Sequence, residues 1–201
     1  MRALILNGTL KRSPQESSTE ALSRVVGDHL TTHGVHVDHV RLVDLDIHPG
    51  VTEDEGDGDA WPQVHQQVLD AEILILATPT WLGQPSSVIK RALERMDSML
   101  SMTDDDGRPV AWGKVAGVVV VGNEDGAHHC IAEIAQAVID LGYTVPGHSW
   151  TYWNKGPGPG DEEYLTSEET EWSNTTGRTA AEMLHAVARA LQAMPLPVPA
   201  G

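Results

Sequence analysis

Basic residues are scarce in this chain of 201 residues. Lysine and arginine together number 13 against 29 aspartates and glutamates, so the formal net charge is −16. Nucleic acids and anionic membranes are bound chiefly through basic patches, which this composition does not favour. The sequence therefore predicts neither a nucleic-acid partner nor a membrane partner.

Cysteine and long apolar runs are also in short supply. Cys130 is the single cysteine, so no disulfide forms within the chain, and this suits a reducing compartment. No stretch approaches the roughly 20 apolar residues that span a bilayer. The apolar run that follows Met1 and Arg2 is too short for a secretory leader. We therefore expect a cytoplasmic protein.

Several sequence motifs are absent as well. Neither Gly-x-x-x-x-Gly-Lys-Ser/Thr nor Gly-x-Gly-x-x-Gly occurs, so the usual nucleotide-binding fingerprints are not supported. The consecutive His128, His129 and Cys130 would point about 100° apart on a helix, which does not make a metal site. The acidic stretches 53–59 and 104–107 lack the ligand spacing of a calcium loop. We predict no metal site.

What the chain does contain is a regular alternation of short apolar runs and helical stripes. The expected strands are residues 3–6, 35–40, 73–77, 115–121 and 143–150, and the expected helices are 18–30, 61–69, 86–96, 131–141 and 180–191. Such alternation is typical of a parallel sheet with helices on both faces. Five strands in about 190 residues favour an α/β, flavodoxin-like doubly wound fold with strand order 2-1-3-4-5. We predict a single domain over residues 1–193 and a proline-rich tail over 194–201.

Three loops follow expected strands and precede expected helices, where an open α/β sheet forms its ligand crevice. The first, residues 7–19, is rich in hydroxyl groups, and Ser17 or Ser18 is suited to cap the following helix. The free N–H groups and the dipole of a helix start attract phosphate. An ordinary N-cap in a polar loop explains this loop equally well when it is taken alone.

The second and third loops carry small residues and one aromatic residue. The second contains Thr78-Pro79-Thr80-Trp81-Leu82-Gly83, and a helical pattern resumes at Ser86. The third, residues 121–128, contains Gly122 and Gly126, and glycine lets backbone approach a flat ligand closely. Taken alone, the third loop is better explained as a glycine-rich turn.

With all three loops in order, nearly the whole chain resembles the NADPH-dependent FMN reductases and related flavodoxin-like NAD(P)H:quinone oxidoreductases. The family's first loop ends in Ser-Asn-Thr, where this chain has Ser17-Ser18-Thr19. Its second loop, Ser-Pro-x-Tyr-x-Gly before a Lys-x-x-(Ile/Leu)-Asp helix, is similar to residues 78–83 and 90–97. Trp81 stands where tyrosine is usual, which keeps a flat ring but loses the phenol. The third loop, Gly-x-x-Gly, is similar to residues 122–126.

The resemblance implies FMN as the cofactor and NAD(P)H as the electron donor. The serines and threonines of the first loop would hold the phosphate, the second loop would line the edge of the ring, and the third would hydrogen-bond its pyrimidine. The predicted cofactor-binding residues are Thr9, Lys11, Ser17, Ser18, Thr19, Pro79, Thr80, Trp81, Leu82, Gly83, Gly122, Asn123, Glu124, Asp125 and Gly126. Because the flavin carries the redox chemistry, no catalytic side chain is predicted.

The implied function is an oxidoreductase that transfers hydride from NAD(P)H to FMN N5 and then electrons to free flavin, a quinone or a similar small-molecule acceptor. The alternative is a flavodoxin-type electron carrier, whose docking on basic redox partners an acidic surface would suit. Against it, the first loop lacks the compact Thr/Ser-Gly-rich form of flavodoxins, and the Trp-rich late segment suggests a covered pocket. A cofactor-free binding protein of the same fold is disfavoured by the intact loops.

Tryptophan is the prevalent aromatic residue, with six copies in a chain that has no phenylalanine. Trp150, Tyr152 and Trp153 come just before the Gly-Pro-rich residues 156–160, and for these three we favour burial at an interface over a pocket wall. The resembled family is usually dimeric or tetrameric. We therefore expect a homodimer or homotetramer with residues 150–172 near the partner's crevice.

Overall fold

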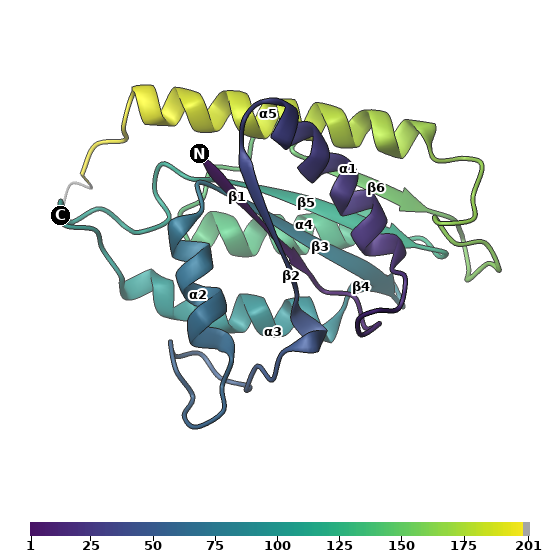
Figure 1. Cartoon of the computed structure of the whole chain (residues 1–201), viewed down its shortest axis with the longest axis horizontal. Coiled ribbons are helices and arrows are strands. Elements are labelled where there is room, and N and C mark those ends of the chain that lie inside the picture. Colours follow the sequence, from purple (N-terminus) through teal and green to yellow (C-terminus); the bar gives the residue numbers. More distant parts are fainter. Residues whose placement is uncertain (199–201) are drawn as a thin grey trace.

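A parallel sheet lies at the centre of the protein, whose computed structural model describes residues 1–198 (Figure 1). Its strands are β1 (Arg2–Asn7), β2 (His36–Arg41), β3 (Ile73–Trp81), β5 (Val115–Gly122) and β6 (Trp150–Asn154). They lie in the order β2-β1-β3-β5-β6, and the short β4 (Gln84–Pro85) pairs antiparallel with the end of β3. Numbered among themselves, the parallel strands of this part of the chain follow the predicted order 2-1-3-4-5. The prediction of a doubly wound sheet is confirmed.

The central strands are buried along nearly their whole length. Every residue of β5 is buried, and so is every residue of β3 except Trp81, as expected for parallel strands that are covered on both faces. Side chains alternate along β1, so that Leu4 and Leu6 enter one core whereas Ala3 and Ile5 enter the other. Full burial of one such leucine contributes about 1.5–3 kcal/mol, and the two cores therefore fix the strand ends from which the loops emerge.

Helices cover both faces of the sheet. They are α1 (Ser18–Thr32), α2 (Trp61–Asp70), α3 (Ser87–Arg95), α4 (Ala127–Asp140) and α5 (Glu171–Ala193), with short 3₁₀ turns η1 (Leu42–Asp44) and η2 (Met96–Ser101). The long α5 packs against α1 on one face, and α2, α3 and α4 pack on the other. No helix within residues 1–198 is both long enough and apolar enough to cross a lipid bilayer.

Two elements differ from the sequence-based expectation. The fifth parallel strand is Trp150–Asn154, so its prediction at residues 143–150 is wrong. Thr144 forms only an isolated bridge with Val115, and the chain then turns at Pro146, whose carbonyl accepts from the N–H of Ser149 (3.2 Å). Because proline has no N–H to donate to a strand ladder, it interrupts a run whose composition favours a strand.

The last helix begins at Glu171, well before the expected start at residue 180. Its first turns are rich in serine, threonine and asparagine, which are weak helix formers. Ser173 and Gly177 are nevertheless buried, so tertiary packing overrides local propensity. The helix ends at Ala193, and residues 199–201 of the expected tail lie outside the described residues. The domain boundary at residue 193 stays a prediction.

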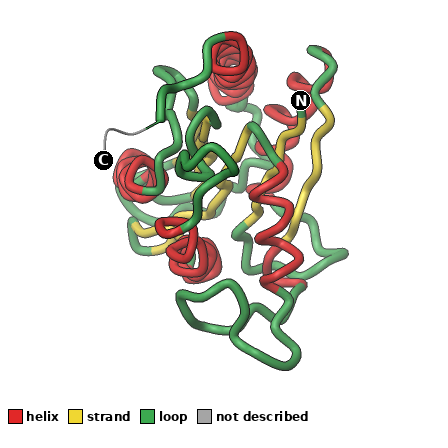
Figure 2. The backbone as a smooth tube through the Cα atoms, turned by 90° about the vertical axis from the view of Figure 1, so that its left-hand side faces the viewer, coloured by secondary structure: helices red, strands yellow, loops and turns green. Residues whose placement is uncertain are grey.

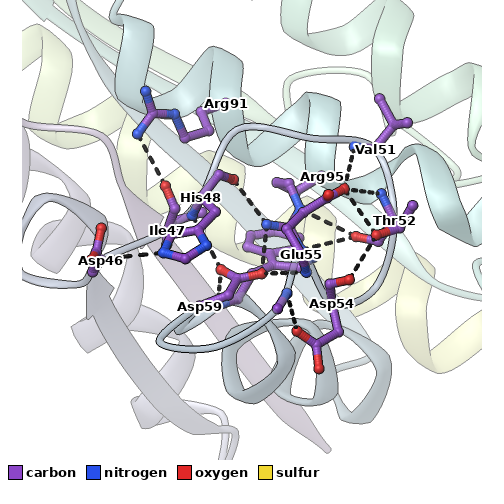
Figure 3. A network of polar contacts seen from close by, with 12 residues as sticks. Asp46, Ile47, His48, Val51, Thr52, Asp54, Glu55, Asp59, Arg91 and Arg95 are labelled. Carbon is purple, nitrogen blue, oxygen red and sulfur yellow. Dashed lines mark hydrogen bonds and ion pairs between the residues drawn. The ribbon is translucent and has the colours of Figure 1, made fainter.

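A buried ion pair holds the loop of residues 45–60, at the bottom of Figures 1 and 2, against α3 (Figure 3). Arg95 Nη1 lies 2.7 Å from Asp59 Oδ2, and both side chains are fully buried. The same guanidinium donates to the backbone carbonyls of His48 (2.8 Å) and Thr52 (2.9 Å). The loop is thus joined to the helix through both its backbone and its carboxylate.

The environment of Asp59 strongly favours its charged form. Burial alone would raise the pKa of this carboxyl, but hydrogen bonds from the backbone N–H groups of Glu55 and Trp61 and from the Arg95 guanidinium outweigh that effect. The pKa of Asp59 is therefore well below its usual value. Charge and hydrogen bonding together keep this end of the molecule closed.

Candidate functional site

A pocket lies at the carboxyl ends of β1, β3, β5 and β6. The sheet order reverses between β1 and β3, and ligands of open α/β sheets bind at such a point. The pocket is lined by Thr9, Leu10, Lys11, Ser17, Ser18, Thr19, Pro79, Thr80, Trp81, Val121, Gly122, Asn123, Trp153, Glu163 and Tyr164. The hydroxyl-rich loop and the aromatic side chains thus contribute to one cavity.

The loop between β1 and α1 supplies most of the polar lining. Thr9 Oγ1 accepts from the N–H of Lys11 (3.3 Å), and Ser17 Oγ accepts from the N–H of Glu20 (3.2 Å), which confirms Ser17 as the N-cap of α1. Thr9, Ser17 and Thr19 are buried. Because the Thr9 and Ser17 hydroxyls act as acceptors within the protein, their protons are left to donate to a ligand.

The start of α1 adds backbone donors to these hydroxyls. The first intrahelical hydrogen bond runs from the N–H of Ala21 to the carbonyl of Ser17 (2.9 Å). The N–H groups of Ser18 and Thr19 precede it and have no carbonyl to reach within the helix. Such groups, with the positive end of the helix dipole, attract anions. Hydroxyls, free N–H groups and the Lys11 ammonium form a donor set that fits a phosphate.

Arg41 braces the same loop from the end of β2. Its guanidinium donates to the backbone carbonyls of Lys11 (3.2 Å) and Gln15 (2.9 Å) and pairs with the Glu20 carboxylate. Burial would raise the pKa of Glu20, but hydrogen bonds from Arg41 and Arg24 hold it below its ordinary value. Nothing in the sequence signals this role of Arg41, because only the pairing of β2 with β1 brings it to the loop.

The second loop is tied to the first by hydrogen bonds. The Ser86 hydroxyl, at the N-cap of α3, donates to the carbonyl of Gly8 (2.6 Å), and the N–H of Gly8 donates to the carbonyl of Ala77 (2.7 Å). Trp81 is half-exposed and lines the pocket. The two loops therefore form a single wall of the cavity.

The second and third loops approach each other closely. A Cβ on Gly126 would lie 2.6 Å from the Cα of Gly83, and both glycines have positive φ angles, of 113° and 73°. The N–H of Leu82 donates to the Glu124 carboxylate. On the pocket side, a Cβ on Gly122 would lie 2.1 Å from Thr80 Cγ2, so only glycine fits there without displacement. These contacts keep the loop backbones close to the cavity.

Within the described residues 1–198, the pocket brings together ten of the fifteen predicted cofactor-binding residues. These ten are Thr9, Lys11, Ser17, Ser18, Thr19, Pro79, Thr80, Trp81, Gly122 and Asn123. Leu82, Gly83, Glu124, Asp125 and Gly126 do not line it. Leu82 is 91% exposed, and the other four lie in the contacts that join the loops to each other and to residue 156. Flavin contact by any of the fifteen stays a prediction.

Residues 155–170, which we call the strap, form a wall that the sequence did not predict. Tyr164 is buried, and its hydroxyl donates to Asn174 Oδ1 (2.6 Å). Its ring meets that of Trp153 edge-on, with centroids 6.1 Å apart, and Trp153 Nε1 donates to the carbonyl of Glu169 (3.1 Å). Burial raises the pKa of the Tyr164 phenol. Tyr164 of the strap and Trp153 of β6 thus form an aromatic wall of the pocket.

Trp153 therefore lies in the pocket wall of its own chain, and the interface favoured for it from sequence is wrong. The alternation along β6 explains this, since Trp153 points to the opposite side from Trp150 and Tyr152. Trp150 and Tyr152 stack on each other with centroids 5.9 Å apart, and His128 packs edge-on against both rings. Within residues 1–198 no group of three His, Cys, Asp or Glu side chains is arranged to hold a metal ion.

Charge in the pocket lining is confined to one contact. Within the described chain, Lys11 is the one cationic and Glu163 the one anionic side chain among the lining residues. Glu163 Oε2 lies 3.2 Å from Lys11 Nζ and 3.4 Å from Ser18 Oγ. Both charged side chains are about half exposed, at 46% and 50%. A carboxylate from the strap thus touches the donors at the start of α1.

Comparisons with known proteins agree with this architecture. The family model of the NADPH-dependent FMN reductases matches residues 1–158. A crystal structure of RosB with bound 8-demethyl-8-formylriboflavin-5'-phosphate is 31% identical, with a TM-score of 0.89 over 98% of this chain and 82% of that chain. An NADH:FMN oxidoreductase (16% identical, TM-score 0.60) and an archaeal flavodoxin (12%, 0.59) share the fold.

Two curated relatives are longer than this chain. The 8-demethyl-8-aminoriboflavin-5'-phosphate synthase of Streptomyces davaonensis is 34% identical over 171 residues, which are 80% of this chain and 66% of the synthase. The divalent metal cation transporter MntH of Mycobacterium bovis is 39% identical over 202 residues, which span 94% of this chain but 30% of the transporter. The fold, the three loops and the family match lead to one conclusion. The chain belongs to the NADPH-dependent FMN reductase family, and its fold is flavodoxin-like.

Proposed function

We propose that the protein is an FMN-dependent oxidoreductase that oxidises NAD(P)H and passes the electrons to a small molecule such as free flavin or a quinone, in the cytoplasm. The observation that carries this proposal is the pocket at the sheet's reversal point, which joins phosphate donors to aromatic walls. The family match supports a flavin in that pocket. When bound, FMN supplies the electron-transfer chemistry itself.

The side chains divide the work of binding between two ends of the pocket. At one end, the hydroxyls of Thr9, Ser17 and Ser18, with the start of α1, would bind the phosphate through charge-assisted hydrogen bonds. At the other, Trp81 and Trp153 present flat apolar surfaces suited to a ring system. Tyr164 and the rest of the strap would shield the ring from water. This shielding favours the transfer of electrons to a bound acceptor over their loss to solvent species.

The colour of the purified protein is the first test. We expect a flavin absorbance spectrum, FMN as the mass of the heat-released cofactor, and bleaching by NADPH or NADH in the absence of oxygen. Recovery of FAD alone, or no uptake of added FMN, would overturn the proposal. A flavin that nicotinamides do not bleach but a reduced partner protein does would favour the flavodoxin-type carrier instead.

A second candidate function treats the flavin phosphate as the substrate. It is favoured by the similarity to the Streptomyces synthase and by the TM-score of 0.89 to RosB, against 0.60 to the NADH:FMN oxidoreductase. In this case the same pocket would hold riboflavin-5'-phosphate while its ring is modified. Mass spectrometry of the flavin after incubation separates the two candidates. A changed flavin mass supports the second, and nicotinamide oxidation with an unchanged flavin supports the first.

We also propose a homodimer. Trp150, Tyr152 and Trp172 form an aromatic cluster at the edge strand β6. Trp172 is 53% exposed, and the centroids of its ring and the Tyr152 ring are 4.9 Å apart. A twofold contact through residues 150–172 would cover this cluster. Light scattering should then give about twice the chain mass of 21.7 kDa, or four times for a tetramer. A monomer at micromolar concentration would contradict this proposal.

A further inference from the structure

The Glu163 carboxylate contacts two of the groups that fit the flavin phosphate of the proposed function. It contacts Lys11 Nζ at 3.2 Å and Ser18 Oγ at 3.4 Å, and Lys11 is the one cation among the lining residues of the described chain. The same ammonium and hydroxyl belong to the donor set that fits the flavin phosphate. Glu163 also lies beyond residues 1–158, so it falls outside the segment that the family model matches.

A carboxylate and a phosphate cannot both occupy this place in their charged forms. At contact distance two like charges repel strongly in a partly buried site, and FMN carries about two negative charges on its phosphate. The Lys11–Glu163 pair itself is half exposed, and such pairs are weak. Of the two anions, the carboxylate is therefore the one that gives way.

The strap does not depend on Glu163 for its position. Lys155 pairs with Glu162 (3.0 Å) and Glu169 (2.6 Å), and Tyr164 is anchored through its hydroxyl to Asn174. Rotation of the Glu163 side chain toward solvent would leave these contacts intact. The strap is thus able to stay in place while its carboxylate leaves the phosphate donors.

We propose that Glu163 acts as an internal competitor for the flavin phosphate. In the free protein it satisfies Lys11 and Ser18, and on binding the phosphate displaces it. The inference rests on the proposed binding of FMN in this pocket, and it deepens that function: the Glu163 carboxylate lowers the affinity of the site for a phosphorylated flavin and so eases its release. A releasable flavin is what a protein needs when flavin phosphate is its substrate or product.

Removal of the competing charge tests the proposal directly. Glu163→Gln should bind FMN roughly 2- to 5-fold more tightly than the wild type, because an exposed charge contact corresponds to a factor of this order. Riboflavin, which has no phosphate, should bind both proteins equally. Glu168→Gln is the matched control, since it removes the same charge from the strap at a residue that is exposed and that forms no ion pair within residues 1–198. Flavin fluorescence titration gives all six dissociation constants.

A second variant separates local competition from a general charge effect. Lys11→Met should weaken FMN binding more in the Glu163→Gln background than in the wild type, because the wild-type ammonium is already partly neutralised. Equal FMN affinity in wild type and Glu163→Gln, or equal tightening for riboflavin and for the Glu168→Gln control, would overturn the inference while leaving FMN binding intact. No FMN binding by any of these proteins would overturn the proposed function and this inference with it.

Discussion

Two ion pairs connect a loop of this protein to another element, and their surroundings differ sharply. Arg95 and Asp59 lie 2.7 Å apart with both side chains fully buried, whereas Lys11 and Glu163 lie 3.2 Å apart with both side chains about half exposed. The first pair is supplemented by hydrogen bonds to backbone groups on either side (Figure 3). The second has the Ser18 hydroxyl as its additional partner.

Burial separates the contacts that the fold keeps fixed from those that can exchange. Breaking a buried pair leaves an uncompensated charge out of water, so the loop of residues 45–60 stays closed on α3. Breaking an exposed pair only returns two groups to solvent at little cost. The exchangeable pair lies in the ligand pocket, whereas the fixed pair joins α3 to the loop of residues 45–60, and neither of these lines the pocket.

The largest expected effect comes from breaking the buried pair. Arg95→Met should lower the free energy of unfolding by about 3–5 kcal/mol, because it leaves Asp59 buried without its guanidinium. Arg91→Met is the control, as Arg91 lies on the same helix but makes one bond to the Ile47 carbonyl (3.0 Å) from an exposed position. Urea denaturation measures both. A loss below about 1 kcal/mol for Arg95→Met would abolish the contrast between the two pairs.

The next largest effect is expected at the phosphate donors of the ligand pocket. Replacing Ser17 and Ser18 together with alanine should weaken FMN binding by roughly 2–4 kcal/mol, if each gives a charge-assisted hydrogen bond to the phosphate. Riboflavin binding should change little. Loss of the Ser17 N-cap costs about 1 kcal/mol of stability, so titrations are performed well below the unfolding transition. Equal losses for both ligands would show that this loop does not bind phosphate.

A substitution at Gly122 tests whether the pocket wall is rigid at positions away from the Lys11–Glu163 pair. Gly122→Ala places a Cβ 2.1 Å from Thr80 Cγ2, and forced repacking of this kind costs about 1–3 kcal/mol. Gly158→Ala, where a Cβ meets nothing within 4 Å, is the control and should be nearly neutral. Thermal unfolding of the two variants gives the comparison. A neutral Gly122→Ala would mean that the wall yields easily.

Acid should weaken the buried pair in a defined direction. A carboxyl whose pKa is lowered by folding stabilises the protein above its unfolded-state pKa, about 3.9, and loses that contribution as the pH falls toward the folded value. The stability advantage of wild type over Asp59→Asn should therefore shrink below about pH 4, by at most about 1.4 kcal/mol per pH unit. Urea denaturation between pH 6 and 3 tests this. An advantage that is constant with pH would contradict the lowered pKa.

The smallest effect is expected at the exposed pair. Lys11→Met should change the free energy of unfolding of the flavin-free protein by less than about 1 kcal/mol, since half-exposed pairs contribute little. Urea denaturation of this variant and of Arg95→Met compares the loss of stability at the exposed pair with that at the buried pair. A loss of several kcal/mol would mean that the strap depends on Lys11, and that Glu163 is not free to leave.

Local sequence patterns predicted most of the architecture. Alternating apolar runs and helical stripes predicted the sheet, its strand order and the three loops, because burial on two faces imposes a composition that is visible residue by residue. The place of residues 17–19 and of Gly122 in the pocket lining was likewise predictable. Helix capping and close backbone approach each restrict the type of residue at a single position. The apolar pattern predicted the wrong bounds for the fifth parallel strand, which follows a proline turn. It also predicted too late a start for the last helix, whose first turns are polar.

Sequence patterns were thus sufficient for the fold class, the family and most of the loop residues that line the pocket at the ends of β1, β3 and β5. The folded structure determines which distant residues join them: Arg41 behind the first loop, Trp153 and Tyr164 in the wall, and Glu163 at the phosphate donors. It alone also decided that Asp59, in an acidic loop, is a buried partner of Arg95. The two kinds of information differ because the interactions differ in range. Periodicity and capping act between near neighbours in the chain, whereas charge pairing and packing depend on contacts that exist only after folding.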